Sequence, residues 1–234
     1  MYDKDSRTKR AYRILRTLED YYGKEKIKKL TLLDVGSSTG IIDYILADKF
    51  NKVVGIDIDI DAIDYAKRSF IKKNLEFKLD DAMGLSLKKE VFDVVICAQI
   101  YEHVPSPQKL LSEIYRVLKP GGVCYFAAIN KLWPWEPHYN LPFLSWVPKN
   151  IAHIYVQIFG KAKNYYETPK TYWELSQITS AFKRVEYTEK ILKDPIKFGY
   201  DNSLGGTLAP ILKIFSPVLK YFVPTFFWLL VKEA

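Results

Sequence analysis

Apolar and polar positions follow two periodic patterns along the first 130 residues. Short apolar runs alternate with stretches in which apolar residues recur every three or four positions. These patterns predict buried strands and amphipathic helices, respectively. Their alternation predicts βαβ units and a parallel sheet with helices on both faces. The expected strands cover residues 30–35, 53–57, 75–80, 92–98 and 123–129, and the expected helices cover 6–22, 41–49, 60–72 and 107–118.

The alternation of strand and helix patterns ends after residue 130. Residues 131–170 are rich in proline and aromatic side chains and too apolar for a linker, so they predict a cap over the ligand crevice. Beyond the cap we expect a helix at 171–180, a strand at 185–192, apolar helical spacing at 207–222 and a last strand at 225–232. The predicted fold is α/β: a Rossmann-like, doubly wound, mostly parallel seven-stranded sheet with an aromatic-rich cap. The expected parts of this single domain, 1–234, are a basic N-terminal helix in 1–29, a core in 30–130, the cap insertion in 131–170 and a C-terminal part in 171–234.

Composition narrows the class of protein. Of the 234 residues, 48% are hydrophobic, 26% charged and 15% aromatic, which supports one core and excludes a disordered chain. Two cysteines, Cys97 and Cys124, cannot form a disulfide scaffold and indicate a reducing, cytoplasmic environment. We expect no secretory signal, because the N-terminus lacks an apolar region. Residues 207–231 contain lysines and prolines, which argues against a membrane-spanning helix.

Charge is unevenly distributed along the chain. Residues 1–30 contain ten basic and five acidic side chains, residues 31–130 contain twelve and fourteen, and residues 131–234 contain thirteen and eight. The core is therefore slightly acidic and both ends are basic. Basic surfaces bind nucleic acid, anionic lipid or anionic substrates, and the alternative is an ordinary lysine-rich surface in solvent.

A glycine-containing loop and an acidic residue point to a nucleoside ligand. The loop from Gly36 to Gly40 follows a strand and precedes a helix, where glycine allows a tight turn and a close approach of ligand to backbone. Asp57 ends the next strand, where a carboxylate can accept two hydrogen bonds from a ribose diol. Asp59 is better placed than Asp57 to cap the following helix. Because Ser38 replaces the middle glycine of a dinucleotide motif, the loop argues against a nicotinamide cofactor.

Taken together, the motifs resemble those of class I S-adenosylmethionine-dependent methyltransferases of the small-molecule branch, and of the ubiquinone and menaquinone type in particular. DVGSSTG at 34–40 resembles the family's first motif, D-x-G-x-G-x-G, apart from Ser38. The other matching segments are GIDIDIDAIDYA at 55–66, LDDAMGL at 79–85, FDVVICAQIYEHV at 92–104 and LLSEIYRVLKPGG at 110–122. The resemblance covers about residues 30–130 and implies methyl transfer from S-adenosylmethionine to a small molecule.

The resemblance also implies which residues hold the cofactor. They are Asp34, Gly36, Ser38 and Gly40 at the methionine portion, Asp57 at the ribose with Ile58 beside it, Asp81 and Ala82 at the adenine, and Gln99 near the sulfonium.

Histidines supply the candidate catalytic groups, since a base is needed only if the acceptor must lose a proton. His103 and His138 are the candidates, and the alternatives are a structural hydrogen bond for His103 and a packing role for His138. Ubiquinone-type enzymes carry an additional acid, associated with a divalent metal, where this chain has Gln99. The sequence therefore predicts no metal requirement.

The acceptor is expected to be apolar or lipid-linked, such as a quinone, a polyprenyl compound or a lipid-linked glycan. The aromatic residues of the cap could line a pocket, lie at a lipid interface or pack as a second core layer. We expect residues 7–16 and 207–222, with Lys213 and Lys220, to face an anionic membrane. Nucleic acid is not expected as a partner, because the chain lacks an amino-methylating motif after residue 98. A soluble metabolite or sugar as acceptor, or a non-catalytic cofactor-binding module, are the alternatives. The aromatic residues in question are Trp133, Trp135, Tyr139, Phe143, Trp146 and Phe159.

Overall fold

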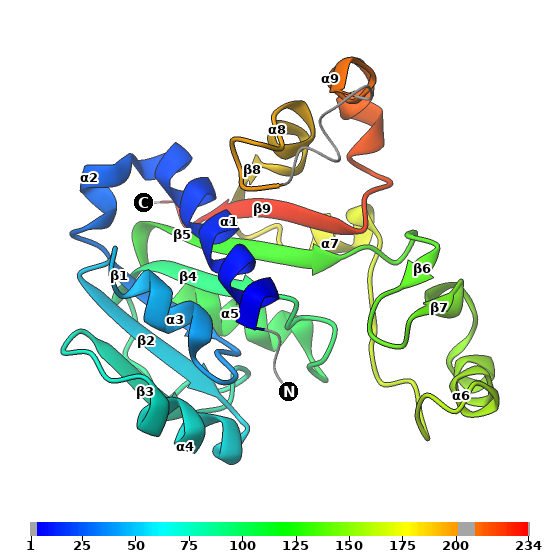
Figure 1. The fold of residues 1–234 in the computed structure, drawn as a ribbon, viewed down its shortest axis with the longest axis horizontal. Coiled ribbons are helices and arrows are strands. Elements are labelled where there is room, and N and C mark those ends of the chain that lie inside the picture. The colour runs from blue at the N-terminus through cyan, green and yellow to red at the C-terminus, as the bar shows by residue number, and fades with distance from the viewer. Residues whose placement is uncertain (1–3, 201–208, 234) are drawn as a thin grey trace.

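The computed structural model describes residues 4–200 and 209–233. At its centre lies a seven-stranded sheet with the order β3-β2-β1-β4-β5-β9-β8 (Figure 1). Strands β1 to β5 are parallel to their neighbours, and β9 is antiparallel to both β5 and β8. The predicted mostly parallel sheet of seven strands is confirmed. The strands are β1 (Thr31–Val35), β2 (Lys52–Asp57), β3 (Leu75–Leu79), β4 (Phe92–Ala98), β5 (Leu118–Ile129), β8 (Lys183–Glu186) and β9 (Thr225–Val231).

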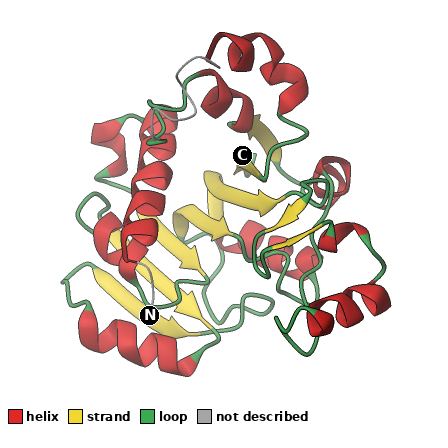
Figure 2. Cartoon of the chain, turned by 45° about the vertical axis from the view of Figure 1, so that its right-hand side comes forward, coloured by secondary structure: helices red, strands yellow, loops and turns green. Residues whose placement is uncertain are grey.

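Helices cover both faces of this sheet, as Figure 2 shows with strands in yellow and helices in red. One face packs against α5 and α7, and the other against α1, α2, α3 and α8. The predicted cap of α4 is confirmed, since Asp59 accepts hydrogen bonds from the backbone N–H groups of Asp61 and Ala62. The helices are α1 (Lys4–Tyr22), α2 (Lys24–Ile27), α3 (Ile41–Leu46), α4 (Ile60–Ser69), α5 (Pro107–Val117), α6 (Lys149–Ile158), α7 (Tyr172–Ile178), α8 (Thr188–Lys193) and α9 (Ala209–Leu219).

Strand β5 shows how the sheet separates two cores. Its side chains are apolar at every position from Val123 to Ile129, and alternate ones enter opposite cores. Cys124 and Phe126 pack with α5, whereas Tyr125 packs with α1. Continuous apolar runs are typical of strands covered on both faces. Cys124 therefore fills space in the core, and burial raises the pKa of its thiol.

The strand order reverses between β1 and β4, which lie side by side although β2 and β3 intervene in the sequence. Ligands of open α/β sheets bind beyond the carboxyl ends of the strands at such a point. The loop after β1, the end of β2 and the loop after β4 meet there. This geometry places the candidate site.

The cap insertion is a small separate layer beside this edge of the sheet. It contains the hairpin strands β6 (Trp135–Glu136) and β7 (Leu141–Pro142), a short 3-10 helix η1 (Leu144–Trp146), and α6. Its own core includes Leu144 and Val156. The two ends of the cap meet at a bridge between Asn130 and Lys170, and the Lys170 N–H donates to the Tyr101 hydroxyl at 2.9 Å. These contacts tie the cap to the loop after β4.

Two sequence predictions differ from the structure in the C-terminal part. Residues 185–192 were predicted as a strand, but β8 ends at Glu186 and α8 begins at Thr188. The Thr188 hydroxyl bonds both the N–H and the carbonyl of Phe227, so a side chain takes the place of the next ladder bonds and the chain turns into a helix. The predicted helix at 207–222 corresponds to α9, which ends at Leu219, while residues 207 and 208 lie outside the described residues. Within the described ranges, no helix combines the length and the apolar character needed to cross a bilayer.

Candidate active site

The glycine loop after β1 is held in a left-handed conformation at two positions that face a cavity. Gly36 has φ +81°, and a Cβ atom there would lie 2.1 Å from Cδ1 of Ile100, so the backbone and the loop after β4 are in close contact. Ser38 has φ +50°, the backbone region that the family's central glycine would enter freely. The serine is therefore accommodated in the conformation of a glycine.

Asp57 is linked directly to this loop. Its carboxylate accepts a hydrogen bond from the Ser38 N–H at 2.7 Å and another from the Asp59 N–H at 3.0 Å. The Ser38 hydroxyl accepts a hydrogen bond from Arg7 of α1 at 3.3 Å. The end of β2, the loop after β1 and the N-terminal helix thus meet at one place, as the sequence predicted for the first two.

A pair of buried carboxyl groups lies beneath the loop. Asp34 on β1 and Asp43 on α3 are 4% and 0% exposed. Burial raises the pKa of both groups, to about 7 for Asp43, and the charge of Asp57 raises both further. The nearby guanidinium groups of Arg7 and Arg10 lower the pKa of Asp34. A positively charged ligand group, such as an amino group, would favour the ionised form of Asp34 in the same way.

A cavity of about 340 Å³ opens at this edge of the sheet, and we call it the cofactor crevice. It brings together seven of the eleven predicted site residues. They are Asp34, Gly36, Ser38, Asp57, Gln99, His103 and His138. The residues that complete its lining are Arg7, Arg10, Ile42, Ile96, Ala98 and Ile100.

Four predicted cofactor residues lie outside the crevice lining. Gly40 begins α3 in a left-handed conformation, and a Cβ atom there would lie 2.5 Å from the ring of Phe77, so its visible role is packing. Ile58 is 72% exposed. Asp81 accepts a hydrogen bond from the Met83 N–H, and Ala82 packs against the core. The assignments of Ile58, Asp81 and Ala82 stay predictions.

Carboxylates and histidines gather where the cap meets the loop after β4. The His138 Nδ1 atom lies 2.7 Å from Oε1 of Glu136, and the rings of His103 and His138 meet edge to face with centroids 4.8 Å apart. The His103 Nδ1 atom lies 3.7 Å from Oε1 of Glu167. Glu102, Glu136 and Glu167 are all buried. We call these five residues the carboxylate–histidine cluster.

The pKa values in this cluster diverge. Burial lowers the pKa of His138, but the hydrogen bond to Glu136 and the charges of the three nearby glutamates together leave that pKa above its ordinary value. Burial lowers the pKa of His103. Burial also raises the pKa of Glu102 to about 7. Such divergence marks groups suited to proton transfer.

The same cluster fits a divalent cation. Ligand atoms of Glu102, His103 and His138 all lie within 4.8 Å of one another. Both carboxylate oxygens of Glu102 are buried and have no hydrogen-bond partner among the described residues. A bound cation would lower the pKa of an acceptor hydroxyl. The prediction of no metal requirement rested on Gln99, and it stays a prediction.

Comparisons with known proteins agree with this geometry. Residues 33–126 match the model of a family described as a methyltransferase domain. Residues 33–126 form a methyltransferase domain. The seven-stranded, mostly parallel sheet has the predicted Rossmann-like arrangement.

Curated relatives of the methyltransferase domain include ubiquinone biosynthesis O-methyltransferases. The one from Coxiella burnetii is 32% identical over 107 residues, which cover 45% of this chain and 46% of that protein. The one from Rickettsia canadensis is 29% identical over 184 residues, which cover 74% of this chain and 75% of that protein. This chain thus spans about half the length of the first curated relatives that it matches.

A solved S-adenosylmethionine-dependent methyltransferase from Methanosarcina mazei has the same fold. It superposes with a TM-score of 0.55 at 19% identity, over 88% of this chain and 93% of that one. The predicted fold class is therefore confirmed.

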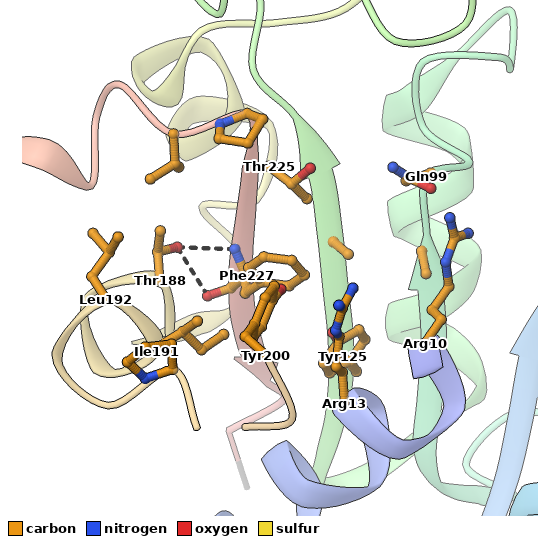
Figure 3. Close-up of a pocket in the computed structure, with 15 residues that line it drawn as sticks. Arg10, Arg13, Gln99, Tyr125, Thr188, Ile191, Leu192, Tyr200, Thr225 and Phe227 are labelled. Carbon is orange, nitrogen blue, oxygen red and sulfur yellow. Dashed lines mark hydrogen bonds between the residues drawn. The ribbon is translucent and has the colours of Figure 1, made fainter. Parts of the chain in front are cut away.

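A second cavity, of about 310 Å³, adjoins the cofactor crevice of the methyltransferase domain, and we call it the side cavity (Figure 3). The two cavities share Arg10, Ala98 and Gln99, so they meet at the end of β4. Its remaining walls come from α1, β5, β9, α8 and the segment after α8. The other lining residues are Arg13, Tyr125, Ala127, Thr188, Ile191, Leu192, Pro195, Tyr200, Val223, Pro224, Thr225 and Phe227.

Sequence reasoning missed the arginines of α1. Residues 7–16 were expected to face an anionic membrane, but Arg7, Arg10 and Arg13 line the two cavities. Their spacing of three residues puts them along one side of α1, next to the buried positions Ala11 and Ile14. Arginines at this spacing, beside the apolar face of the helix, were the sequence feature that could have indicated cavity-lining residues.

Proposed function

We propose that this protein transfers the methyl group of S-adenosylmethionine to a hydroxyl oxygen of an apolar small molecule. The observation that carries the proposal is the side cavity, which is lined largely by apolar side chains and joins the cofactor crevice at Gln99. Ligand sites are typically apolar cavities of this size with a few polar groups. The names of the curated relatives, which are O-methyltransferases, support oxygen as the methylated atom.

His138 is the proposed base, with Glu136 as its positioning residue. If the Nδ1–H donates to Glu136, Nε2 is left as the proton acceptor within the crevice. The cofactor supplies a methyl group that its sulfonium already activates. Nε2 accepts the proton of the hydroxyl, whose oxygen forms the bond to the methyl carbon as the carbon–sulfur bond breaks. The walls of the crevice orient the acceptor and exclude water.

A labelled cofactor tests the proposal. The protein is incubated with S-adenosylmethionine that carries a tritiated methyl group. The mixture also contains an extract of cells that naturally produce this protein. We expect label to enter product, and most of it to pass into organic solvent once the mixture is acidified, so that any acidic group of the product is neutral. Label that stays in the aqueous phase would indicate a soluble metabolite or sugar instead. Cofactor binding without any transfer of label would indicate a regulatory module.

We also propose that the cap holds the enzyme at an anionic membrane surface. Residues 131–170 contain five lysines and two acidic residues, Glu136 and Glu167, both of which are buried. On α6, Ile151, Ile154 and Ile158 are 48%, 56% and 74% exposed at helical spacing. Exposed apolar side chains beside positive charge are typical of interfacial helices.

This surface differs from the one expected from the sequence. Arg7, Arg10 and Arg13 line cavities rather than an outer face. The Lys220 ammonium is 3.2 Å from Glu189, so its charge is paired. The cap supports the membrane proposal better than residues 7–16 and 207–222 do, and several of its aromatic side chains are about half exposed. They are Trp135, Phe143, Trp146 and Phe159.

Sedimentation with anionic vesicles tests the cap surface. We expect binding at low salt, because each basic residue near such a surface contributes about 1 kcal/mol. Binding should weaken as salt rises, since screening acts over about 8 Å at physiological ionic strength. Ile154→Gln together with Ile158→Gln should reduce sedimentation, whereas Ile71→Gln, at an isoleucine that is 81% exposed outside the cap, should not. Protein that stays in the supernatant at low salt would refute membrane attachment.

A further inference from the structure

The side cavity carries positive charge without negative charge. Among the described residues that line it, Arg10 and Arg13 are cationic and none is acidic. Figure 3 shows both side chains reaching from α1 into the cavity, with Arg10 extending towards Gln99. A cavity built in this way favours a ligand that combines an apolar body with an anionic group.

Arg13 is oriented but keeps donors for a ligand. Its Nε–H donates to the Gly199 carbonyl at 3.4 Å, and its guanidinium carbon lies 4.1 Å from the centroid of the Tyr200 ring. Both contacts fix the side chain beside the cavity. A guanidinium has five N–H donors, so its terminal nitrogens can still bind a carboxylate or a similar group in a bidentate manner.

Arg10 adds a second cation in the same space. Within residues 4–200 and 209–233, it makes no hydrogen bond or ion pair with the protein. Burial lowers its pKa, and the charges of Arg7 and Arg13 lower it further. Because Arg10 lies at the junction with the cofactor crevice, an anion there would relieve repulsion among the three arginines.

Aromatic rings line the side cavity next to the arginines of α1. The ring centroids of Tyr125 and Tyr200 each lie 6.4 Å from that of Phe227. Ile191 and Leu192 of α8 complete the apolar side. A volume of about 310 Å³ is at the small end for ligand pockets, so it suits a compact body.

From these observations we infer that the side cavity binds the acceptor as a compact apolar acid. Its anionic group lies at Arg13, with Arg10 beside it, and its apolar body packs against Phe227. Its hydroxyl is directed to Gln99, where the cavity meets the cofactor crevice. The inference rests on the proposed function and names the substrate class for it.

A matched pair of dyes tests the inference without turnover. Anilinonaphthalene sulfonate has an apolar body and one anionic group, and phenylnaphthylamine has nearly the same body without charge. Both become fluorescent in apolar cavities. We expect Arg13→Gln to weaken sulfonate binding about tenfold or more, because charge-assisted hydrogen bonds are lost, and to leave the neutral dye nearly unchanged. Leu192→Trp, which fills the cavity, should weaken both dyes.

Two further variants of the chain control for charge and folding. Lys9→Gln removes the same charge from an exposed position of α1 and should not alter sulfonate binding. Arg13→Lys keeps the charge and should retain most of the affinity for the sulfonate dye. The inference is overturned if Arg13→Gln weakens sulfonate binding no more than Lys9→Gln does. It is also overturned if Leu192→Trp leaves sulfonate binding intact.

Calorimetry with S-adenosylmethionine separates this inference from the proposed function. Arg13 lines the side cavity and not the cofactor crevice, so Arg13→Gln should keep the cofactor affinity of the parent protein. Loss of sulfonate binding with cofactor binding intact supports the acidic acceptor. Label transfer to a product with unaltered dye binding in Arg13→Gln would refute the acidic acceptor and leave methyl transfer standing.

Discussion

Replacing His138 with glutamine is expected to lower the turnover number about 10²–10⁴-fold, the usual contribution of a general base. The physical reason is the loss of Nε2 as the proton acceptor while the crevice keeps its shape. Cofactor affinity should change little, because the residues around the glycine loop remain in place. The measurement is the rate of label transfer under saturating cofactor.

His153→Gln is the matched control for this substitution. His153 also lies in the cap, but its Nδ1 accepts a hydrogen bond from the Tyr165 N–H and its side chain does not line the crevice. The control variant should keep most of the turnover. Equal losses in His138→Gln and His153→Gln would show that cap structure, and not proton transfer, explains the effect.

The pH dependence follows from the direction of the His138 pKa. Only the neutral ring accepts a proton, so turnover should rise with pH through the pKa of His138. Burial lowers that pKa, but the hydrogen bond to Glu136 and the charges of Glu136, Glu102 and Glu167 together raise it by more, so the midpoint should lie above the ordinary value for histidine. Glu136→Gln removes the charge and should move the midpoint to lower pH. An unchanged midpoint in Glu136→Gln would refute the role of Glu136.

A chelator tells whether the carboxylate–histidine cluster works through a base or through a cation. Full activity in the chelator is expected from the sequence, with His138 as base. Loss of activity that magnesium restores would instead place a cation at Glu102, His103 and His138, whose ligand atoms lie within 4.8 Å of one another. His138→Gln would then lower metal affinity as well as turnover, which separates the two outcomes.

The glycine loop and Asp57 were predictable because their chemistry is local. A strand, a tight turn and a helix follow one another within a few residues, and the parallel strand order fixes which edge they share. The same reasoning placed Asp59 as the cap of α4, since the side chain bonds N–H groups only two and three residues away.

The carboxylate–histidine cluster and the side cavity depend on contacts that no local pattern specifies. Glu136 and His138 reach His103 only because the cap returns to β4 through Tyr101 and Lys170. The side cavity combines Arg13 with Tyr200, which lie on segments far apart in the sequence. Amphipathic spacing predicts that α1 buries one face, but not that a row of arginines beside that face meets a cavity.

Asp57→Ala is expected to weaken S-adenosylmethionine binding by about 1–3 kcal/mol, or roughly 5–150-fold in the dissociation constant. Two ligand hydroxyl groups would lose their acceptor in a partly buried site. The loop would also loosen, because the Ser38 N–H donates to the same carboxylate at 2.7 Å and Ser38 is held at a positive φ. Calorimetry on the purified protein measures the change.

Asp61→Ala provides the control, since it removes the same charge from the exposed first turn of α4. The control should bind cofactor like the parent protein, and Asp57→Asn should fall between the two, because an amide oxygen still accepts one hydrogen bond. Melting temperatures without cofactor show whether loosening of the loop alone accounts for the loss. If Asp57→Ala binds as tightly as Asp61→Ala, the ribose does not lie at Asp57, and the cofactor occupies the crevice in a different orientation from the one its lining favours.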